Sequence, residues 1–183
     1  MKKLLIFYML ISVAFADNKF MSKYVFEWGE KNPKIVEQYL KNSIQFKTTK
    51  NANAAYILGN LYLSGTFLEK DLKKADIYIT IAANLNLPEA LNSIGDGYYS
   101  GDIREKDIKR ALYYYEKAAR LGFGPGQFNA GIVLLKYGKT KNDLKKSIFY
   151  LDKASKNIHD LDSIVNSAKK YKNHAISKYK HIS

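Results

Sequence analysis

The chain has 183 residues, 46% of them hydrophobic and 26% charged, which is typical of a soluble chain that can fold into one modest domain. Its formal net charge is +13. It contains no cysteine, which excludes disulfide bonds, so packing alone must hold its elements together.

Residues 1–16 have the three parts of a secretory signal peptide. Two lysines follow the first residue, residues 4–13 form an apolar run, and residues 14–16 (Ala-Phe-Ala) match a small-x-small cleavage site. The alternative is an uncleaved membrane anchor, but the apolar run is too short to span a bilayer comfortably. We therefore expect cleavage before Asp17, no transmembrane segment after it, and a bacterial protein that is periplasmic or secreted.

Residues 17–51 are expected to form a degenerate helix pair that caps the N-terminal end of the fold. An apolar helical face before Gly29 is expected to end at that glycine. Asn32 and Pro33 then predict a new helix start, because asparagine is favoured at the N-cap and proline at the first helical position.

The rest of the chain is organised around a 36-residue stretch that occurs in tandem at 52–87 and 88–123, with a fainter third copy at 124–159. The first two copies are identical at 14 positions, where ordinary composition gives about two or three matches. The third copy keeps Gly131, Asp143, Lys145, Tyr150 and Ala154. A repeat of this length indicates a solenoid rather than a globule with a single core.

Each copy is predicted to contain two helices joined by a short loop. Left-handed residues are expected to end these helices, at Gly65, Gly101, Asn86 and Gly122. An aspartate precedes each second apolar run and is expected to be its N-cap, at Asp71, Asp107 and Asp143.

Glycines recur at one register inside the predicted first helices, where each costs about 1 kcal/mol relative to alanine. They are Gly59, Gly95 and Gly131. A cost repeated at one register indicates close approach of the paired helix. The small residues expected opposite them are Ala75, Ala111 and Ser147, or Ala82, Ala118 and Ala154.

Three consecutive tyrosines, residues 113–115, fall in the predicted second helix of the second copy. Successive helical positions point in different directions. We expect Tyr114 to lie in the core and either Tyr113 or Tyr115 to face a groove.

Residues 160–183 are predicted to form a C-terminal capping helix with a basic tail, since a terminal repeat needs a polar outer face.

The pattern of Leu58, Gly59, Tyr62 and Gly65, followed by Asp71 and the later alanines, resembles the Sel-one-like repeat, a relative of the tetratricopeptide repeat. The third copy departs from it, with Leu134 at the tyrosine position and its glycine one place late at Gly138. The resemblance implies an all-α fold, a right-handed α-solenoid of helix-turn-helix repeats. It also implies a role in protein contacts without shared catalytic residues.

First helices line the concave face of such a solenoid, and that face is the expected binding site. Its candidate residues are Asn60, Leu63, Asp96, Tyr99, Ile132 and Leu135. Asparagine and aromatic side chains there would hold a protein or peptide partner. We expect a monomer that uses no cofactor or metal.

Basic residues also recur in register, on the predicted second helices. They are Lys73, Lys74, Lys109, Arg110, Lys145 and Lys146. This basic ridge either attracts an anionic partner (an acidic protein, a cell-wall polymer or a lipid headgroup) or is simply a solvated face. Nucleic acid is not expected, because the protein is expected to be exported and carries no nucleic-acid-binding motif.

An enzymatic role is the alternative, because some exported cysteine-rich Sel-one-like proteins have been labelled β-lactamases or penicillin binders. Ser-x-x-Lys occurs at Ser167 and at Ser177, but about two such pairs are expected by chance and no companion motif follows either. The three histidines lack metal-ligand spacing, and the acidic loop 102–107 is expected to be a salt-bridged turn rather than a calcium site.

Overall fold

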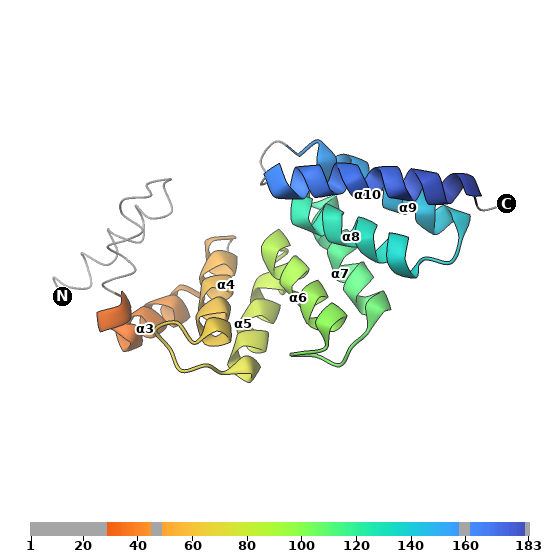
Figure 1. Cartoon of the computed structure of the whole chain (residues 1–183). Coiled ribbons are helices and arrows are strands. Elements are labelled where there is room, and N and C mark those ends of the chain that lie inside the picture. The colour runs from red at the N-terminus through yellow and green to blue at the C-terminus, as the bar shows by residue number, and fades with distance from the viewer. Residues whose placement is uncertain (1–28, 45–48, 158–161, 182–183) are drawn as a thin grey trace.

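The computed structural model describes residues 29–44, 49–157 and 162–181, and the regular elements within these ranges are helical throughout (Figure 1). The helices are α3 (Pro33–Ile44), α4 (Thr49–Ser64), α5 (Leu72–Asn84), α6 (Pro88–Ser100), α7 (Ile108–Arg120), α8 (Gly124–Tyr137), α9 (Lys141–Ser155) and α10 (Asp162–His181). The expected signal peptide, residues 1–16, lies outside the described residues. Helix α3 begins at Pro33 as predicted, and residues 29–31 before it are also helical. The apolar helical face expected before Gly29 lies outside the described residues.

Each helix packs against the next one along the chain, which gives the stacked row of helix pairs in Figure 1. The first helices α6 and α8 also pack against each other, whereas the second helices α5 and α7 approach each other less. First helices therefore line the inner side of the row, and second helices line the outer side. The expected all-α repeat fold is confirmed.

The signals that end the helices act as the sequence predicts. Positive φ angles of 75°, 90° and 86° occur at Gly65, Gly101 and Gly122, and Asn86 has φ 60°. Glycine has no Cβ to clash in this left-handed region, and asparagine tolerates it better than most residues.

Two of the three expected aspartate caps are present. Asp71 accepts a hydrogen bond from the Lys74 amide at 2.9 Å, and Asp107 accepts one from the Arg110 amide at 3.0 Å. The prediction for Asp143 is wrong, because α9 begins earlier, at Lys141, after a shorter loop. Thr140 is the N-cap there, and Asp143 closes a capping box by accepting from the Thr140 amide at 2.9 Å.

The repeated glycines do admit the paired helix, but the residues opposite them are large. A Cβ added at Gly59 would lie 2.7 Å from Ile79 Cγ1, and one added at Gly131 would lie 2.6 Å from Leu151 Cγ. Tyr115 is in the same position opposite Gly95. Small residues lie at the glycines as well, as predicted, in the first and third copies: the Ala75 carbonyl oxygen would be 3.2 Å from the Cβ at Gly59, and Ser147 Oγ donates to the Gly131 carbonyl oxygen at 2.7 Å. Each glycine also makes room for a larger buried side chain from the second helix, which the sequence analysis did not predict.

The tyrosine triplet is oriented differently from the prediction. Tyr115 is the core residue and is only 3% exposed, whereas Tyr113 is 54% exposed. Tyr114 is half-buried and stacks on Tyr98, with ring centroids 5.8 Å apart. Tyr62 and Tyr78 repeat this stack in the first copy at 5.9 Å.

Helix α10 closes the C-terminal end of the row by packing on α9 and, to a smaller extent, on α8 (Figure 1). Its buried residues are Ala168 and Ala175, and the second of these joins a core with Leu135, Leu144 and Leu151. No helix among the described residues is both long and apolar enough to cross a membrane.

Candidate functional site

The inner side of the row carries hydrogen bonds that run directly from one first helix to the next. Tyr56 on α4 and Ser93 on α6 are joined at 3.0 Å between their hydroxyl oxygens. Asn129 on α8 donates to Asn92 Oδ1 on α6 at 3.1 Å. We call the surface formed by these four residues and Asp96 the inner face.

Asp96 is the acidic centre of the inner face. It accepts from Asn92 Nδ2 at 3.0 Å and from the Tyr115 hydroxyl at 2.8 Å. The residue remains exposed on one side, but the surrounding protein removes enough water to raise the pKa of its carboxyl group, and the bond from Tyr115 offsets part of that rise. Burial and the nearby Asp96 carboxylate raise the pKa of Tyr115.

An aromatic and cationic group lies beside this centre. Tyr99 packs edge-on against Tyr137, with ring centroids 6.2 Å apart, and Lys136 Nζ lies 3.5 Å from the Tyr99 hydroxyl oxygen. The two phenol oxygens raise the pKa of Lys136, and Tyr99 and Lys136 lower the pKa of Tyr137. Tyr99 is half-buried, as a contact residue at the edge of the inner face would be.

The other four candidate binding residues lie in different surroundings. Asn60 and Leu63 are half-buried on α4, and Leu63 packs against two neighbouring cores. Leu135 is only 7% exposed, and Ile132 packs against the same core beneath α10. The expectation that Leu135 lines an open binding face is wrong, because α10 covers it.

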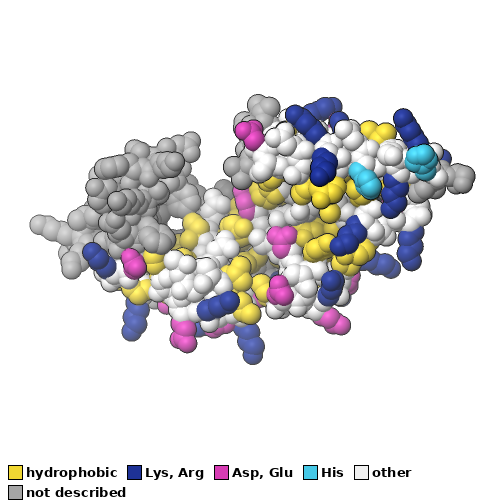
Figure 2. Space-filling view, viewed as in Figure 1, with side chains coloured by type: hydrophobic (Ala, Val, Ile, Leu, Met, Phe, Trp, Pro, Cys, Tyr) yellow, Lys and Arg dark blue, Asp and Glu magenta, His cyan; other side chains and the backbone are white. Residues whose placement is uncertain are grey.

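Charge is unevenly distributed over the molecule. Figure 2 shows acidic side chains over the middle of the visible face, around α6, and Lys and Arg side chains over α10 and toward the C-terminal end. Hydrophobic side chains show between α8 and α10 in the same view.

All six residues of the predicted basic ridge are exposed, on second helices. Two of them are partly neutralised by the N-cap beside them: Lys74 Nζ lies 3.3 Å from Asp71, and Arg110 Nε lies 3.4 Å from Asp107. Lys145 Nζ lies 6.0 Å from the centroid of the Tyr179 ring.

Arg104 is a structural residue that the sequence analysis missed. It lies in the loop of the second copy and reaches back to the first copy, where it contacts Asp76 at 2.5 Å and donates to Thr80 at 2.7 Å. Its guanidinium also lies over the Tyr98 ring, 5.1 Å from the centroid. The loop 102–107 was expected to be a salt-bridged turn, but its Arg104 pairs with a residue outside the loop. The first copy has Leu68 at the equivalent position, and this leucine is buried against α3 residues. The position within the repeat was therefore the only sequence signal that Arg104 lies at a junction between copies.

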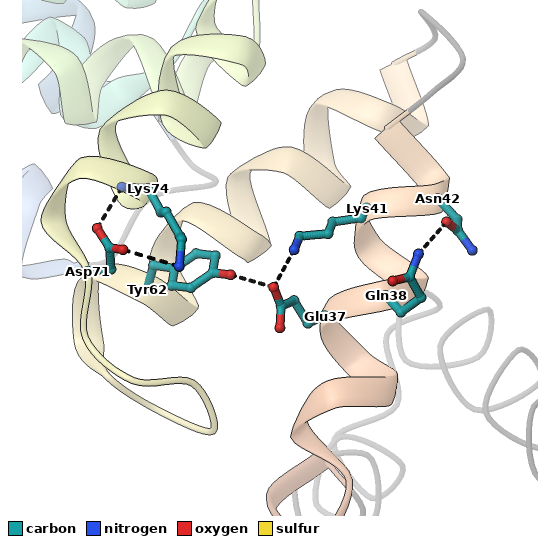
Figure 3. Close-up of polar contacts among 7 residues, drawn as sticks. All are labelled: Glu37, Gln38, Lys41, Asn42, Tyr62, Asp71 and Lys74. Carbon is teal, nitrogen blue, oxygen red and sulfur yellow. Dashed lines mark hydrogen bonds and ion pairs between the residues drawn. The ribbon is translucent and has the colours of Figure 1, made fainter.

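The junction of α3 with the first repeat is polar at its edge (Figure 3). Glu37 on α3 accepts from the Tyr62 hydroxyl at 2.6 Å and pairs with Lys41 one turn later. These two bonds lower the pKa of Glu37, and burial together with the Glu37 bond raises that of Tyr62. Lys74 lies over the same tyrosine ring, 5.0 Å from the centroid. Glu37 and Tyr62 thus tie the N-terminal cap to the repeats.

Residues considered for chemistry do not converge in the described part of the chain. Ser167 and Ser177 both lie on α10, with Lys170 and Lys180 exposed to solvent. Within the same residues no group of three or more His, Cys, Asp or Glu side chains could hold a metal ion.

The stacked helix pairs and the polar inner face define a helical repeat protein. The Sel1 repeat profile matches residues 52–87, 88–123 and 124–159, the same three ranges as the internal repeat. The chain belongs to the Sel1 repeat family, as the sequence pattern indicated. Sel1 repeat proteins generally act as scaffolds for protein–protein interaction.

Two solved structures share this fold. A Sel1 repeat protein from Oxalobacter formigenes is similar at a TM-score of 0.59 and 23% identity, over 73% of this chain and 96% of that one. A protective antigen present in uropathogenic Escherichia coli strains, which displays an SLR fold, is similar at a TM-score of 0.63 and 19% identity. That match covers 84% of this chain and 33% of the antigen, so this chain spans about a third of that protein. No curated protein matches the sequence.

Proposed function

We propose that this protein is an exported scaffold that binds a segment of another protein along its inner face, over α4, α6 and the first half of α8. The observation that carries the proposal is the row of amide, hydroxyl and carboxylate groups that joins successive first helices at half-exposed positions. These groups keep hydrogen-bonding capacity on their solvent side, since an amide or a carboxylate can make more bonds than those it makes here.

An extended segment is the partner that suits this row. Asn92 and Asn129 each carry both a donor and an acceptor, so they can pair with the amide and carbonyl groups of a peptide backbone. Asp96 favours a donor or a cationic side chain opposite it. Tyr99 offers a half-buried aromatic anchor of the kind that contributes strongly to interfaces. Because α10 covers Leu135, the proposed surface ends before the C-terminal turn of α8.

Affinity capture with charge-reversed variants tests this proposal. We expect Asp96→Lys to lose one or a few envelope proteins that the unaltered chain retains, measured by quantitative mass spectrometry. Asp102→Lys makes the same charge change at an exposed loop position and is expected to retain them. Equal retention by both variants, or equal loss, would count against the inner face as the binding site.

Export is part of the proposal and has its own test. The protein recovered from the periplasmic or secreted fraction is expected to begin at Asp17 when its N-terminus is sequenced. A cytoplasmic protein that still begins at Met1 would contradict export while leaving the binding face untouched.

As a binding protein, the purified chain is expected not to hydrolyse nitrocefin. Turnover that survives the double substitution Ser167→Ala/Ser177→Ala would favour an enzyme with a site elsewhere. Turnover that the double substitution abolishes would place a β-lactamase site on α10.

A further inference from the structure

Three large apolar side chains are exposed at the same register on the outer side of the solenoid. Ile77 on α5, Tyr113 on α7 and Phe149 on α9 are 56%, 54% and 53% exposed, and they are 36 residues apart. Neither the core nor the inner face uses them. Because the three side chains share one register in successive repeats, we call them the outer column.

A lysine precedes each residue of the outer column by one helical turn, and a lysine follows two of the three. Lys73, Lys109 and Lys145 lie one helical turn before the three apolar residues, and all are exposed. One turn after them, Lys117 Nζ lies 5.7 Å from the Tyr113 ring centroid and Lys153 Nζ lies 4.6 Å from the Phe149 ring centroid. Their ammonium groups therefore lie over the exposed rings, at the surface.

The carboxylates on the same helices leave this charge largely uncompensated. Asp76 is paired with Arg104, and Asp152 is paired with Lys156 and Lys172. The remaining acidic residues of these helices are Asp143, which closes the capping box of α9, and Glu116, which lies beside Tyr150. No carboxylate partner of Lys73 or Lys109 is found in the part of the chain that the structure describes.

An open depression of about 390 Å³ lies at the α9 end of the column. Its lining residues are Glu116, Arg120, Lys145, Lys146, Phe149 and Tyr150. Three cations and one carboxylate surround an exposed aromatic ring there. This arrangement favours a ligand in which a small anionic group is attached to an apolar group.

We propose that the outer column and its flanking lysines dock the protein on the surface of an anionic phospholipid bilayer. Apolar and aromatic side chains at one register, with a lysine before each and a lysine after Tyr113 and Phe149, match the boundary between headgroups and acyl chains, where aromatic rings insert and lysines meet phosphate groups. The depression beside Phe149 receives one phosphate headgroup.

The position of the column favours a bilayer over an acidic protein. The column lies on the outer side of the row, and the depression beside Phe149 is lined by residues of α7 and α9. A bilayer presents negative charge over a wide area and can contact three successive repeats at once. The column is separate from the inner face, so this proposal does not depend on the proposed function.

Sedimentation with vesicles tests the proposal on the full chain. The unaltered protein is expected to pellet with phosphatidylcholine vesicles that contain phosphatidylglycerol and to stay in solution with phosphatidylcholine alone. All variants carry the same N-terminal residues, so any contribution from the apolar run at 4–13 is common to them. Circular dichroism and thermal melting confirm that each variant is folded.

Two pairs of comparisons make the result specific. Lys73→Glu/Lys109→Glu is expected to weaken binding about tenfold or more, whereas Lys169→Glu/Lys170→Glu, the same charge change on exposed residues of α10, is expected to change it less than about twofold. Replacing Ile77, Tyr113 and Phe149 together by serine is also expected to weaken binding about tenfold.

Three results would overturn the proposal. One is the absence of binding to the vesicles that contain phosphatidylglycerol. Another is an equal loss in the two charge variants, which would show that only net charge matters. The third is unchanged binding of the serine variant, which would show that the outer column takes no part in contact with the bilayer.

Discussion

The ring of Tyr115 lies directly against Gly95 of the paired helix, so that a Cβ at position 95 would come within 2.6 Å of ring atoms Cδ1 and Cε1. Tyr115 is buried and hydrogen-bonded to Asp96, and it has little room to move. We expect Gly95→Ala to lower the free energy of unfolding by about 2 kcal/mol, because overpacking outweighs the helix-propensity gain of about 1 kcal/mol.

Gly97→Ala is the matched control in the same helix. The nearest atom to a Cβ at position 97 is Arg104 Cδ at 3.5 Å, which is an ordinary contact. Urea unfolding of this variant is expected to show unchanged or slightly raised stability. Equal stability of the two alanine variants would show that position 95 does not need glycine to accommodate the Tyr115 ring.

A second prediction concerns the junction between the first two repeats. Arg104→Ala removes the contacts with Asp76 and Thr80 at a side chain that is only 16% exposed. It is expected to cost about 1–2 kcal/mol of unfolding free energy, and thermal unfolding should become less cooperative because neighbouring repeats stabilise one another through their interfaces.

Arg110→Ala is the comparison for that junction. This side chain is 66% exposed and pairs with Asp107 inside its own repeat, so its loss is expected to cost less than about 0.5 kcal/mol. An equal cost for the two arginines would mean that Arg104 contributes only as a surface charge.

A third prediction follows from the raised pKa of Asp96. Its folded-state pKa lies above its unfolded value, so ionisation is disfavoured in the folded protein, and this penalty appears as pH rises through the folded pKa. The stability of Asp96→Asn relative to the unaltered protein should therefore increase from below the ordinary aspartate value of 3.8 up to neutral pH. Urea midpoints across this range measure it, and a difference that is independent of pH would contradict the pKa shift.

Glu37 is expected to behave with the opposite sign. Its pKa is lowered by the bonds from Lys41 and Tyr62, so its contribution is fully present above the ordinary value of 4.5 and is lost as pH falls through the folded pKa. Glu37→Gln should be destabilised at neutral pH and approach the stability of the unaltered protein in acid. If Glu37→Gln were still less stable than the unaltered protein at low pH, the substitution would be disturbing hydrogen-bond geometry and not a charge interaction.

The repeat architecture could be predicted because the residues that start and end its helices act locally. Gly65 and Gly101 end helices through their own backbone geometry, and Asp107 caps the helical turn that follows it. None of these effects depends on distant parts of the chain. Asp143 is not the N-cap because the third loop is shorter, so that α9 begins at Lys141 and Thr140 is its N-cap. The sequence marked this change only by the displaced glycine at 138.

The orientation of second-helix side chains was harder to predict, because positions 113–115 are all apolar or aromatic in every copy. The alanines at positions 111 and 118 exclude Tyr113 from the core face, but Tyr114 and Tyr115 both lie three or four residues from each of them, so this spacing does not decide between the two. The covering of Leu135 could not have been predicted, since no sequence pattern states where α10 docks.

Site-specific photo-crosslinking from Asn60, one helical turn after Tyr56 of the inner face, tests the central claim most directly. A photoreactive residue in place of Asn60 is compared with one in place of Asn173, which is exposed on α10. The account predicts a discrete adduct with another protein from position 60, none from position 173, and loss of that adduct when Asp96→Lys is added. Adducts of equal yield from both positions, or an adduct from position 60 that the Asp96→Lys substitution leaves unchanged, would contradict it.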